Sequence, residues 1–263
     1  MTREGQMFHL MTEYHVPTNA DRHEEYLTCL RENLKNPLIG KIHIFLESNR
    51  KRPPIDDPKI VYAKAHQKSF EEHKKANISE YDKEYLKRTE QARASYSDYF
   101  RYARENLHGE NCIIANSDIF FDETLEVIDG VDLKNTLICL SRWDIKEGLG
   151  GKAVRLFNRP DSQDSWIFTS PINEEVEEKT TFFLGRMGCD NKLAWIAYHA
   201  GVKLTNPAKQ IIAKHLHMVD YRTYLIADAV DGVRDGDFIR VHITDDWELS
   251  RVGDAKDYYI ESR

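Results

Sequence analysis

The amino-acid sequence predicts an α/β protein with a mixed, mainly parallel sheet flanked by helices and a small C-terminal β appendage. Apolar runs at 7–11 and 41–46 enclose a segment with helical periodicity, which is the pattern of a β-α-β unit. A crossover of this length implies that the two strands pair in parallel. A further apolar run at 112–115 is rich in β-branched residues and indicates a buried strand.

The helix of the first unit has clear start and core signals. Thr18 or Asn19 can cap its N-terminus, and acidic residues follow in its first turns. Leu27, Leu30 and Leu34 are spaced three and four residues apart, so they share the face that would pack on the sheet.

The middle of the chain continues the alternation of helices and strands. Residues 66–90 are highly charged and predict a largely solvated helix, and 92–107 predict a second helix with an aromatic stripe. Core packing is the preferred interpretation of that stripe, ahead of a stacking platform. Strands are expected at 136–140, 162–168 and 202–205, with a helix between the last two that begins near Asp190.

Two regions are expected. Residues 1–225 form the main domain, and residues 226–263 form a C-terminal hairpin appendage. Asp-Gly pairs at 231–232 and 235–236 are turn signals, and 238–243 alternate between apolar and polar residues.

Composition excludes several classes of protein. The 263-residue chain is 41% hydrophobic and carries a net charge of −7, so it has no basic excess for binding nucleic acid. Its four cysteines form no CxxC pair, and Cys112 and Cys139 lie in apolar runs that predict buried free thiols. No apolar run is long enough for a transmembrane segment. We expect a cytoplasmic protein, soluble or peripherally associated with a membrane.

Polar groups at the ends of predicted strands indicate a site. Asp118 follows the strand at 112–115, where ligands bind in open α/β sheets, and His215 and His217 share one face of a late strand. A carboxylate and an imidazole could hold Mn²⁺ or Mg²⁺ and leave positions open for diphosphate oxygens. The alternatives are that Asp118 caps a turn or helix and that the histidines are ordinary strand residues.

Asp190 stands where the cap of a later helix is expected. As a cap it would stabilise that helix by about 1 kcal/mol. The helix N-terminus would also keep its carboxylate ionised at neutral pH, and an ionised carboxylate can act as a general base toward a hydroxyl.

The order of these motifs resembles the GT-A class of nucleotide-sugar glycosyltransferases. The shared features are the β-α-β start, the Ala-Asn-Ser-Asp strand end at 115–118, Gly-x-x-Gly-Cys-Asp at 185–190, and His-x-His at 215–217. The resemblance implies that Asn116, Ser117 and Asp118 stand in place of the DxD motif, although Asn116 replaces the usual first aspartate. It implies Asp118 with His217 or His215 as metal ligands.

The resemblance also implies roles for other residues. By position, Thr12 and Glu13 lie beside the nucleotide base, and Arg93 is a candidate contact to the donor. Asp164 and Trp166 would face the acceptor, because an aromatic ring stacks well on a sugar.

The resulting function is a metal-dependent glycosyltransferase. It would move a sugar from a nucleoside-diphosphate sugar to an acceptor hydroxyl, such as that of a glycan, and would invert the anomeric centre with Asp190 as the base. A sugar-phosphate nucleotidyltransferase is one alternative, although the stretch 12–20 lacks the glycines of its phosphate loop. A non-catalytic carbohydrate-binding or assembly protein is the other.

Overall fold

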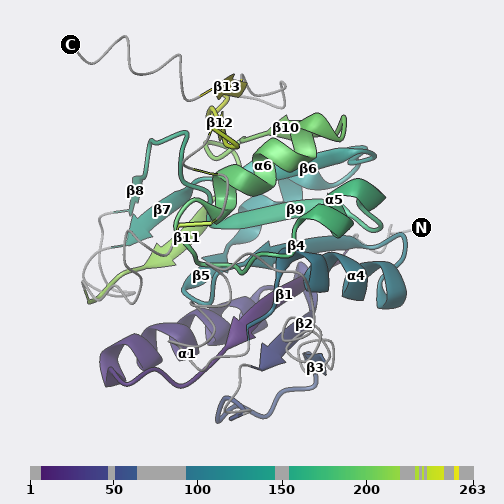
Figure 1. Ribbon diagram of the computed structural model, residues 1–263. Coiled ribbons are helices and arrows are strands. Elements are labelled where there is room, and N and C mark those ends of the chain that lie inside the picture. The colour runs from purple at the N-terminus through teal and green to yellow at the C-terminus, as the bar shows by residue number, and fades with distance from the viewer. Residues whose placement is uncertain are drawn as a thin grey trace, which may run out of the picture.

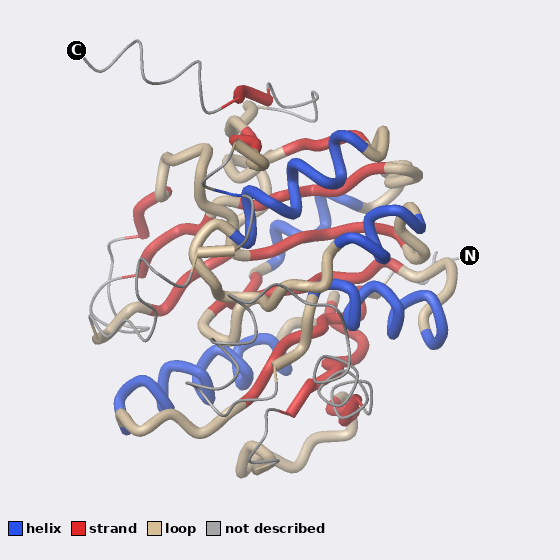
Figure 2. The backbone as a smooth tube through the Cα atoms, in the orientation of Figure 1, coloured by secondary structure: helices blue, strands red, loops and turns tan. Residues whose placement is uncertain are grey.

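A computed structural model describes residues 7–46, 51–63, 93–145, 154–219, 229–230, 233, 236–245 and 252–254. The charged helix predicted at 66–90 and the turn predicted at 231–232 lie outside the described residues. Figure 1 and Figure 2 show a central sheet with helices on both faces and a smaller group of strands at one side. The predicted α/β class, with a mostly parallel sheet flanked by helices, is confirmed.

The described elements follow one another in this order: β1 (Phe8–Tyr14), α1 (Ala20–Lys35), β2 (Ile39–Leu46), β3 (Ile60–Ala63), α4 (Tyr96–Asn106), β4 (Asn111–Ala115), β5 (Ile119–Phe121), the 3₁₀ helix η1 (Glu123–Ile128), β6 (Thr136–Leu140), β7 (Arg142–Ile145), β8 (Val154–Leu156), β9 (Ser165–Thr169), α5 (Glu174–Lys179), α6 (Cys189–His199), β10 (Lys203–Thr205), β11 (Ala213–Leu216), β12 (Ile239–Val241) and β13 (Val252–Asp254).

The central sheet has seven strands in the order β10-β6-β9-β4-β1-β2-β3. β1 pairs in parallel with β2 and β4, as the β-α-β pattern predicts. β9 runs antiparallel to its two neighbours, β4 and β6. Within the described residues, β9 is therefore the reversed strand of this sheet, and the carboxyl ends of β1 and β4 meet at one edge.

Side chains alternate between two cores, one on each face of the sheet. Met11 and Cys112 point toward α4, α5 and α6 on one face, whereas Leu10 and Ile113 point toward α1 and η1 on the other. This alternation is expected of strands buried on both faces. All four cysteines are free and buried, which confirms the prediction for Cys112 and Cys139.

The helix ends follow the local capping chemistry. Asn19 caps α1 by accepting a hydrogen bond from the Arg22 amide at 2.9 Å, as one of the two predicted caps. The helix predicted at 92–107 begins at Tyr96, because Ser95 and Asp98 form a reciprocal capping box there. Its aromatic stripe packs in the core, as predicted.

A second, smaller sheet has the order β5-β11-β7-β8. β11 pairs in parallel with β7 and antiparallel with β5, so it joins the strand that follows Asp118 to the strand that contains Asp144. In this register His215 is opposite Ile119 on one side and Asp144 on the other. Segments nearly 100 residues apart in sequence thus converge on one point.

Strand β12, in the C-terminal part of the chain, packs in the main core. β12 and β13 pair antiparallel, as a hairpin requires. Ile239 and Val241 are buried with α6, however, and the Val241 carbonyl accepts a hydrogen bond from Asn206 at 3.0 Å. The pairing expected of the C-terminal hairpin is present, and the apolar side chains of its first strand, β12, pack against α6. Among the described residues, no helix is both long and apolar enough to cross a membrane.

A contact between the buried His43 and the half-buried His9 predicts acid sensitivity. His9 Nδ1 lies 2.9 Å from His43 Nε2, and His43 Nδ1 lies 3.0 Å from the Tyr102 hydroxyl. Burial, with His9 and Lys41 adding to it, lowers the pKa of His43 from 6.5 to about 4. The unfolded chain binds more protons than the folded chain between these values. The contribution of His43 to the free energy of unfolding is therefore intact above pH 6.5 and is lost as the pH falls toward 4.

We expect the free energy of unfolding to fall by up to about 1.4 kcal/mol per pH unit across that window through this group. Urea unfolding at pH 7, 6 and 5 measures the slope for the wild type and for His43→Phe, which should have the shallower slope. His199→Gln, a change at an exposed histidine, should leave the slope unaltered. Equal slopes in wild type and His43→Phe would contradict the prediction.

Candidate active site at the end of the central strand

The Asn116-Ser117-Asp118 turn is anchored on both sides. β4 ends at Ala115, and the Ile119 amide donates to the Asn116 carbonyl at 3.1 Å to close the turn. Ser117 Oγ donates to the Glu13 carbonyl at 2.7 Å, at the end of the neighbouring strand β1. The prediction that Asp118 directly follows a buried strand is confirmed, and the turn presents it in a fixed position.

Asp118 is buried and faces two cationic groups. Its Oδ2 lies 2.5 Å from Arg22 Nη2 and 3.2 Å from His215 Nε2. Burial by itself would raise the pKa of this carboxyl, but His215 and Arg22 outweigh burial and hold it well below its usual range. Its Oδ1 is buried and has no hydrogen-bond partner among the described residues.

His215 is held by a carboxylate at each ring nitrogen. Nδ1 lies 2.8 Å from Asp144 Oδ1, and Nε2 contacts Asp118. Burial opposes the charged form, but the two carboxylates raise the pKa of His215 to about 9, so both nitrogens donate at neutral pH. Burial would raise the pKa of Asp144, but its contacts with His215 and Arg142 lower it to about 2.

His217 lies just beyond the end of β11 and stacks on His215. The two ring centres are 5.3 Å apart, so the prediction that both histidines face the same side is confirmed. Burial and the neighbouring charge of His215 lower the pKa of His217. A neutral imidazole is the form that binds a metal.

Arg142 joins this group to Asp164. Its Nε donates to Asp144 at 2.9 Å, and its Nη1 donates to Asp164 Oδ2, also at 2.9 Å. Asn116 Nδ2 donates to the other oxygen of Asp164 at 3.0 Å. The predicted donor residue Asn116 and the predicted acceptor residue Asp164 are therefore in direct contact.

Asp190 differs from its prediction in two ways. Gly188 caps α6 with a positive φ of 75° and without a side-chain hydrogen bond, so Asp190 lies inside the first turn. Its Oδ2 accepts a hydrogen bond from the Gln163 amide at 3.0 Å. Burial raises its pKa to about 7, with Asp164 adding to the shift, so the predicted full ionisation at neutral pH is wrong.

Glu13 and Arg93 contact each other instead of lying separately beside a donor. Arg93 Nη2 lies 2.8 Å from Glu13 Oε2, and the Ala94 amide donates to the other carboxylate oxygen at 2.9 Å. This pair ties the end of β1 to the segment that precedes α4. Thr12 precedes Glu13 and is nearly buried.

A pocket opens between the ends of β1 and β4. Leu10, Leu30 and Ile44 supply apolar surface, and the polar lining includes predicted donor residues. The polar or partly polar lining residues are Thr12, Glu13, Tyr14, Tyr26, Asn33, Asn116 and Ser117. Thr12, Glu13, Asn116 and Ser117 were predicted from sequence, so the structure brings these four together around one pocket.

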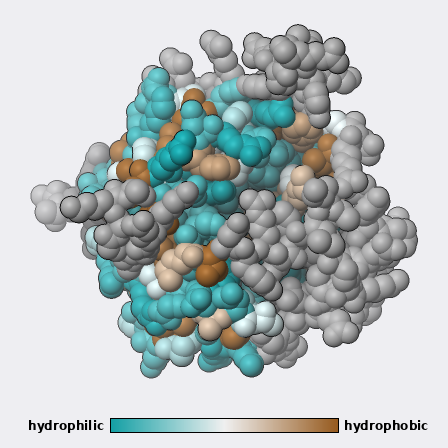
Figure 3. Space-filling model, turned by 90° about the vertical axis from the view of Figure 1, so that its left-hand side faces the viewer, coloured by the Kyte–Doolittle hydropathy of each residue, from teal (hydrophilic) through white to brown (hydrophobic). Residues whose placement is uncertain are grey.

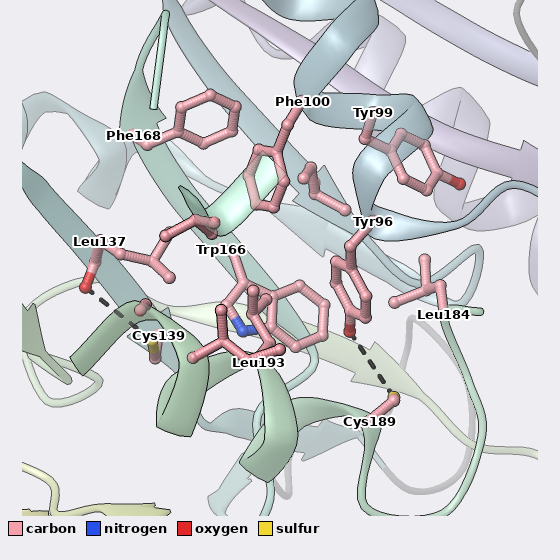
Figure 4. Packing of buried hydrophobic residues seen from close by; sticks show 14 of the residues in the cluster. Tyr96, Tyr99, Phe100, Leu137, Cys139, Trp166, Phe168, Leu184, Cys189 and Leu193 are labelled. Carbon is pink, nitrogen blue, oxygen red and sulfur yellow. Dashed lines mark hydrogen bonds between the residues drawn. The ribbon is translucent and has the colours of Figure 1, made fainter. Parts of the chain in front are cut away.

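Trp166 is not available to stack on a sugar. It is 0% exposed, and its ring meets Tyr96 edge-on with the ring centres 5.0 Å apart. Figure 4 shows it within the core between Phe100 and Leu193. On β9 the side chains alternate between the two cores, and this position faces α4 and α6. The acceptor-facing role expected for Trp166 is therefore corrected, whereas Asp164 precedes β9 at the site.

Four residues of this site were not predicted from the sequence: Arg22, Glu25, Arg142 and Asp144. Asp144 and Arg142 carried a faint signal, because they follow directly on the predicted strand at 136–140. Arg22 and Glu25 lie in the first turns of α1 and look like ordinary helix residues in sequence. Figure 3 views the molecule from the side where β7, β8 and β11 lie, and hydrophilic residues cover much of the described surface there.

Comparisons with known proteins do not supply a family. A scan against models of known protein families finds no match, and a search of curated proteins finds none either. The functional argument therefore depends on the geometry of these residues.

Proposed function

We propose that this protein is a metal-dependent glycosyltransferase of the GT-A type, which transfers a sugar from a nucleoside-diphosphate sugar to an acceptor hydroxyl. One observation carries the proposal. Asp118 is a buried carboxylate at the end of a central strand, beside a partly apolar pocket, and one of its oxygens has no hydrogen-bond partner among the described residues. A buried, unsatisfied carboxylate oxygen is costly unless a ligand completes it.

Asp118 and one histidine would be the protein ligands of a divalent cation in this proposal. No group of three candidate ligands occurs among the described residues, so the protein would supply two ligands and the donor diphosphate the others. His215 is held in its charged form by two carboxylates. His217 stacks on it and has a lowered pKa, so its neutral imidazole would be the second ligand to Mn²⁺ or Mg²⁺. A bound cation would neutralise charge on the departing nucleoside diphosphate.

In this proposal the nucleoside part of the donor would bind at the pocket beside Asp118. Apolar side chains would contact the base, and Thr12, Asn116 and Ser117 offer hydroxyl and amide groups to the ribose. Glu13 would act here by positioning, because its carboxylate holds Arg93 and the Ala94 amide.

Asp190 would serve the acceptor side. The Gln163 amide fixes its carboxyl next to Asp164, which can accept a hydrogen bond from the acceptor. A pKa of about 7 leaves Asp190 partly ionised at neutral pH, where a general base works efficiently. It would take the hydroxyl proton as the oxygen attacks the anomeric carbon opposite the leaving diphosphate, which inverts that centre.

Thermal unfolding with Mn²⁺ and UDP, GDP, CDP or ADP tests the proposal. At a ligand concentration of 100 times Kd the folded state gains about 2.7 kcal/mol. For a chain of this size we expect Tm to rise by roughly 5–10 °C with the correct diphosphate, and only in the presence of the metal. A larger shift with a nucleoside triphosphate plus sugar phosphate would favour a nucleotidyltransferase. A shift with glycans alone would favour a carbohydrate-binding protein, and no shift with any diphosphate would contradict the transferase.

A further inference from the structure

Arg22 occupies the carboxylate that the proposed metal would need. Its Nη2 lies 2.5 Å from Asp118 Oδ2, and its Nη1 lies 2.6 Å from Glu25 Oε2. The Arg22 side chain is 16% exposed, while those of Asp118 and Glu25 are 9% and 0% exposed. This guanidinium thus contacts the carboxylate at the end of the central strand, and nothing in the sequence pattern assigns it a role.

Glu25 makes a fixed anchor for Arg22. Its Oε1 accepts hydrogen bonds from the backbone amides of Met218 and Val219, the two residues that follow His217. The carboxylate therefore ties α1 to the segment that carries the candidate metal ligand. Because Arg22 binds Glu25 through Nη1 and Asp118 through Nη2, it can release Asp118 while keeping Glu25.

We propose that Arg22 is a built-in cation that holds Asp118 when the site is empty, yields it to a divalent cation, and then binds a phosphate of the donor through the freed Nη2. This inference rests on the proposed function. A divalent cation at the unpartnered Oδ1 would lie close to the guanidinium that contacts Oδ2 of the same buried carboxylate. Two cations held this close repel each other strongly, so metal and guanidinium compete for Asp118.

The position of Arg22 also favours its proposed binding to a donor phosphate after it has released Asp118. Its guanidinium carbon lies 5.0 Å from the ring centre of Tyr26, and Tyr26 lines the pocket between β1 and β4. A guanidinium at the edge of that pocket is near the proposed nucleotide. The planar donor fork of arginine matches phosphate oxygens well.

The first measurement is the Kd of Mn²⁺ alone by titration calorimetry, with no nucleotide present. Arg22→Met removes the competing charge, so Mn²⁺ should bind about tenfold more tightly than to the wild type, within the usual range of coupling between two ligands. Arg22→Gln keeps a hydrogen-bond donor for Glu25 and should give the same result if the Met variant fails to fold. Unchanged or weaker Mn²⁺ binding in a folded variant would overturn the proposal.

The second measurement is the Kd of UDP and of GDP at saturating Mn²⁺. The same variants should bind whichever diphosphate the wild type prefers about tenfold more weakly, because a phosphate ligand is lost. Unchanged diphosphate affinity would overturn the proposal that Arg22 binds a donor phosphate. Arg31→Met is the matched control, since Arg31 lies on the same helix in an exposed pair with Glu24, and it should change neither constant.

The two proposals fail in different ways. Wild type that binds Mn²⁺ and a diphosphate, with Arg22 variants that behave identically, would overturn the role of Arg22 and leave the transferase standing. Absence of Mn²⁺ binding in the wild type together with binding in Arg22→Gln would support Arg22 as the competitor. Absence of binding in both would overturn the metal site and the role of Arg22 together.

Discussion

Asp118→Asn is expected to abolish Mn²⁺ binding and to lower transfer by at least about 100-fold, as removal of a key electrostatic group commonly does. The amide has the shape of the carboxylate but no charge, so it cannot attract the cation or balance Arg22 and His215. Titration calorimetry with Mn²⁺ measures the first effect, and release of nucleoside diphosphate from candidate donors measures the second.

The same substitution should also destabilise the fold. Asp118 is more acidic in the folded chain than in the unfolded chain, so its ionised form contributes stability above the ordinary carboxyl pKa of 3.8, and this is lost as the pH falls below it. Removing one partner from a buried ionic group costs about 3 kcal/mol. Asp122→Asn is the matched control, because Asp122 is nearby and pairs with Lys214 at 2.8 Å. Wild-type Mn²⁺ affinity in Asp118→Asn would contradict the metal assignment.

Asp190→Asn is expected to lower kcat by a factor of about 10²–10⁴, the usual contribution of a general base. In the wild type, kcat/KM should rise with pH and level off above about 7, because only the ionised carboxylate can accept the proton. The variant should lose this rise. Full activity of Asp190→Asn at pH 7 would show that the base assignment is wrong.

Asp190→Asn should lower activity but raise the stability of the folded chain. The pKa of Asp190 is raised from 3.8 to about 7 in the folded chain, so the folded state holds a proton that the unfolded state has lost. This group therefore reduces stability as the pH rises from 4 to 7. Asn removes that penalty, and Tm should increase at pH 8 but change little at pH 4. Asp237→Asn is the control, since Asp237 pairs at the surface with Lys192, which lies on α6 like Asp190. A lower Tm for Asp190→Asn at pH 8 would contradict this interpretation.

Local signals predicted the local structure well. Apolar runs marked β1, β2, β4 and β6, and Asn19 was one of two predicted caps for α1. The turn after β4 and the common face of His215 and His217 were also visible, because a two-residue period and a strand end are properties of short segments. Asn116, Ser117, Glu13 and Thr12, which the family resemblance implied as donor contacts, line one pocket at the ends of β4 and β1.

The errors came from long-range packing. Trp166 was expected at the acceptor, but alternation along β9 directs it into the core between α4 and α6. Asp190 was expected at the N-cap of its helix, but Gly188 is the cap of α6 and the Asp190 carboxyl accepts a hydrogen bond from the Gln163 amide. Neither outcome can be read from a short window, because each depends on which distant element covers the residue.

The sequence by itself determined the α/β class, the parallel β1–β2 pair, and the position of Asp118 at the end of a buried strand. Only the tertiary structure decided the partners of Asp118. β11 inserts between β5 and β7 and brings His215 to Asp118 and Asp144, while α1 packs so that Arg22 reaches the same carboxylate. Strand order and helix docking depend on the burial of whole faces, and so the charges that meet at this site come from segments with no local relation to one another.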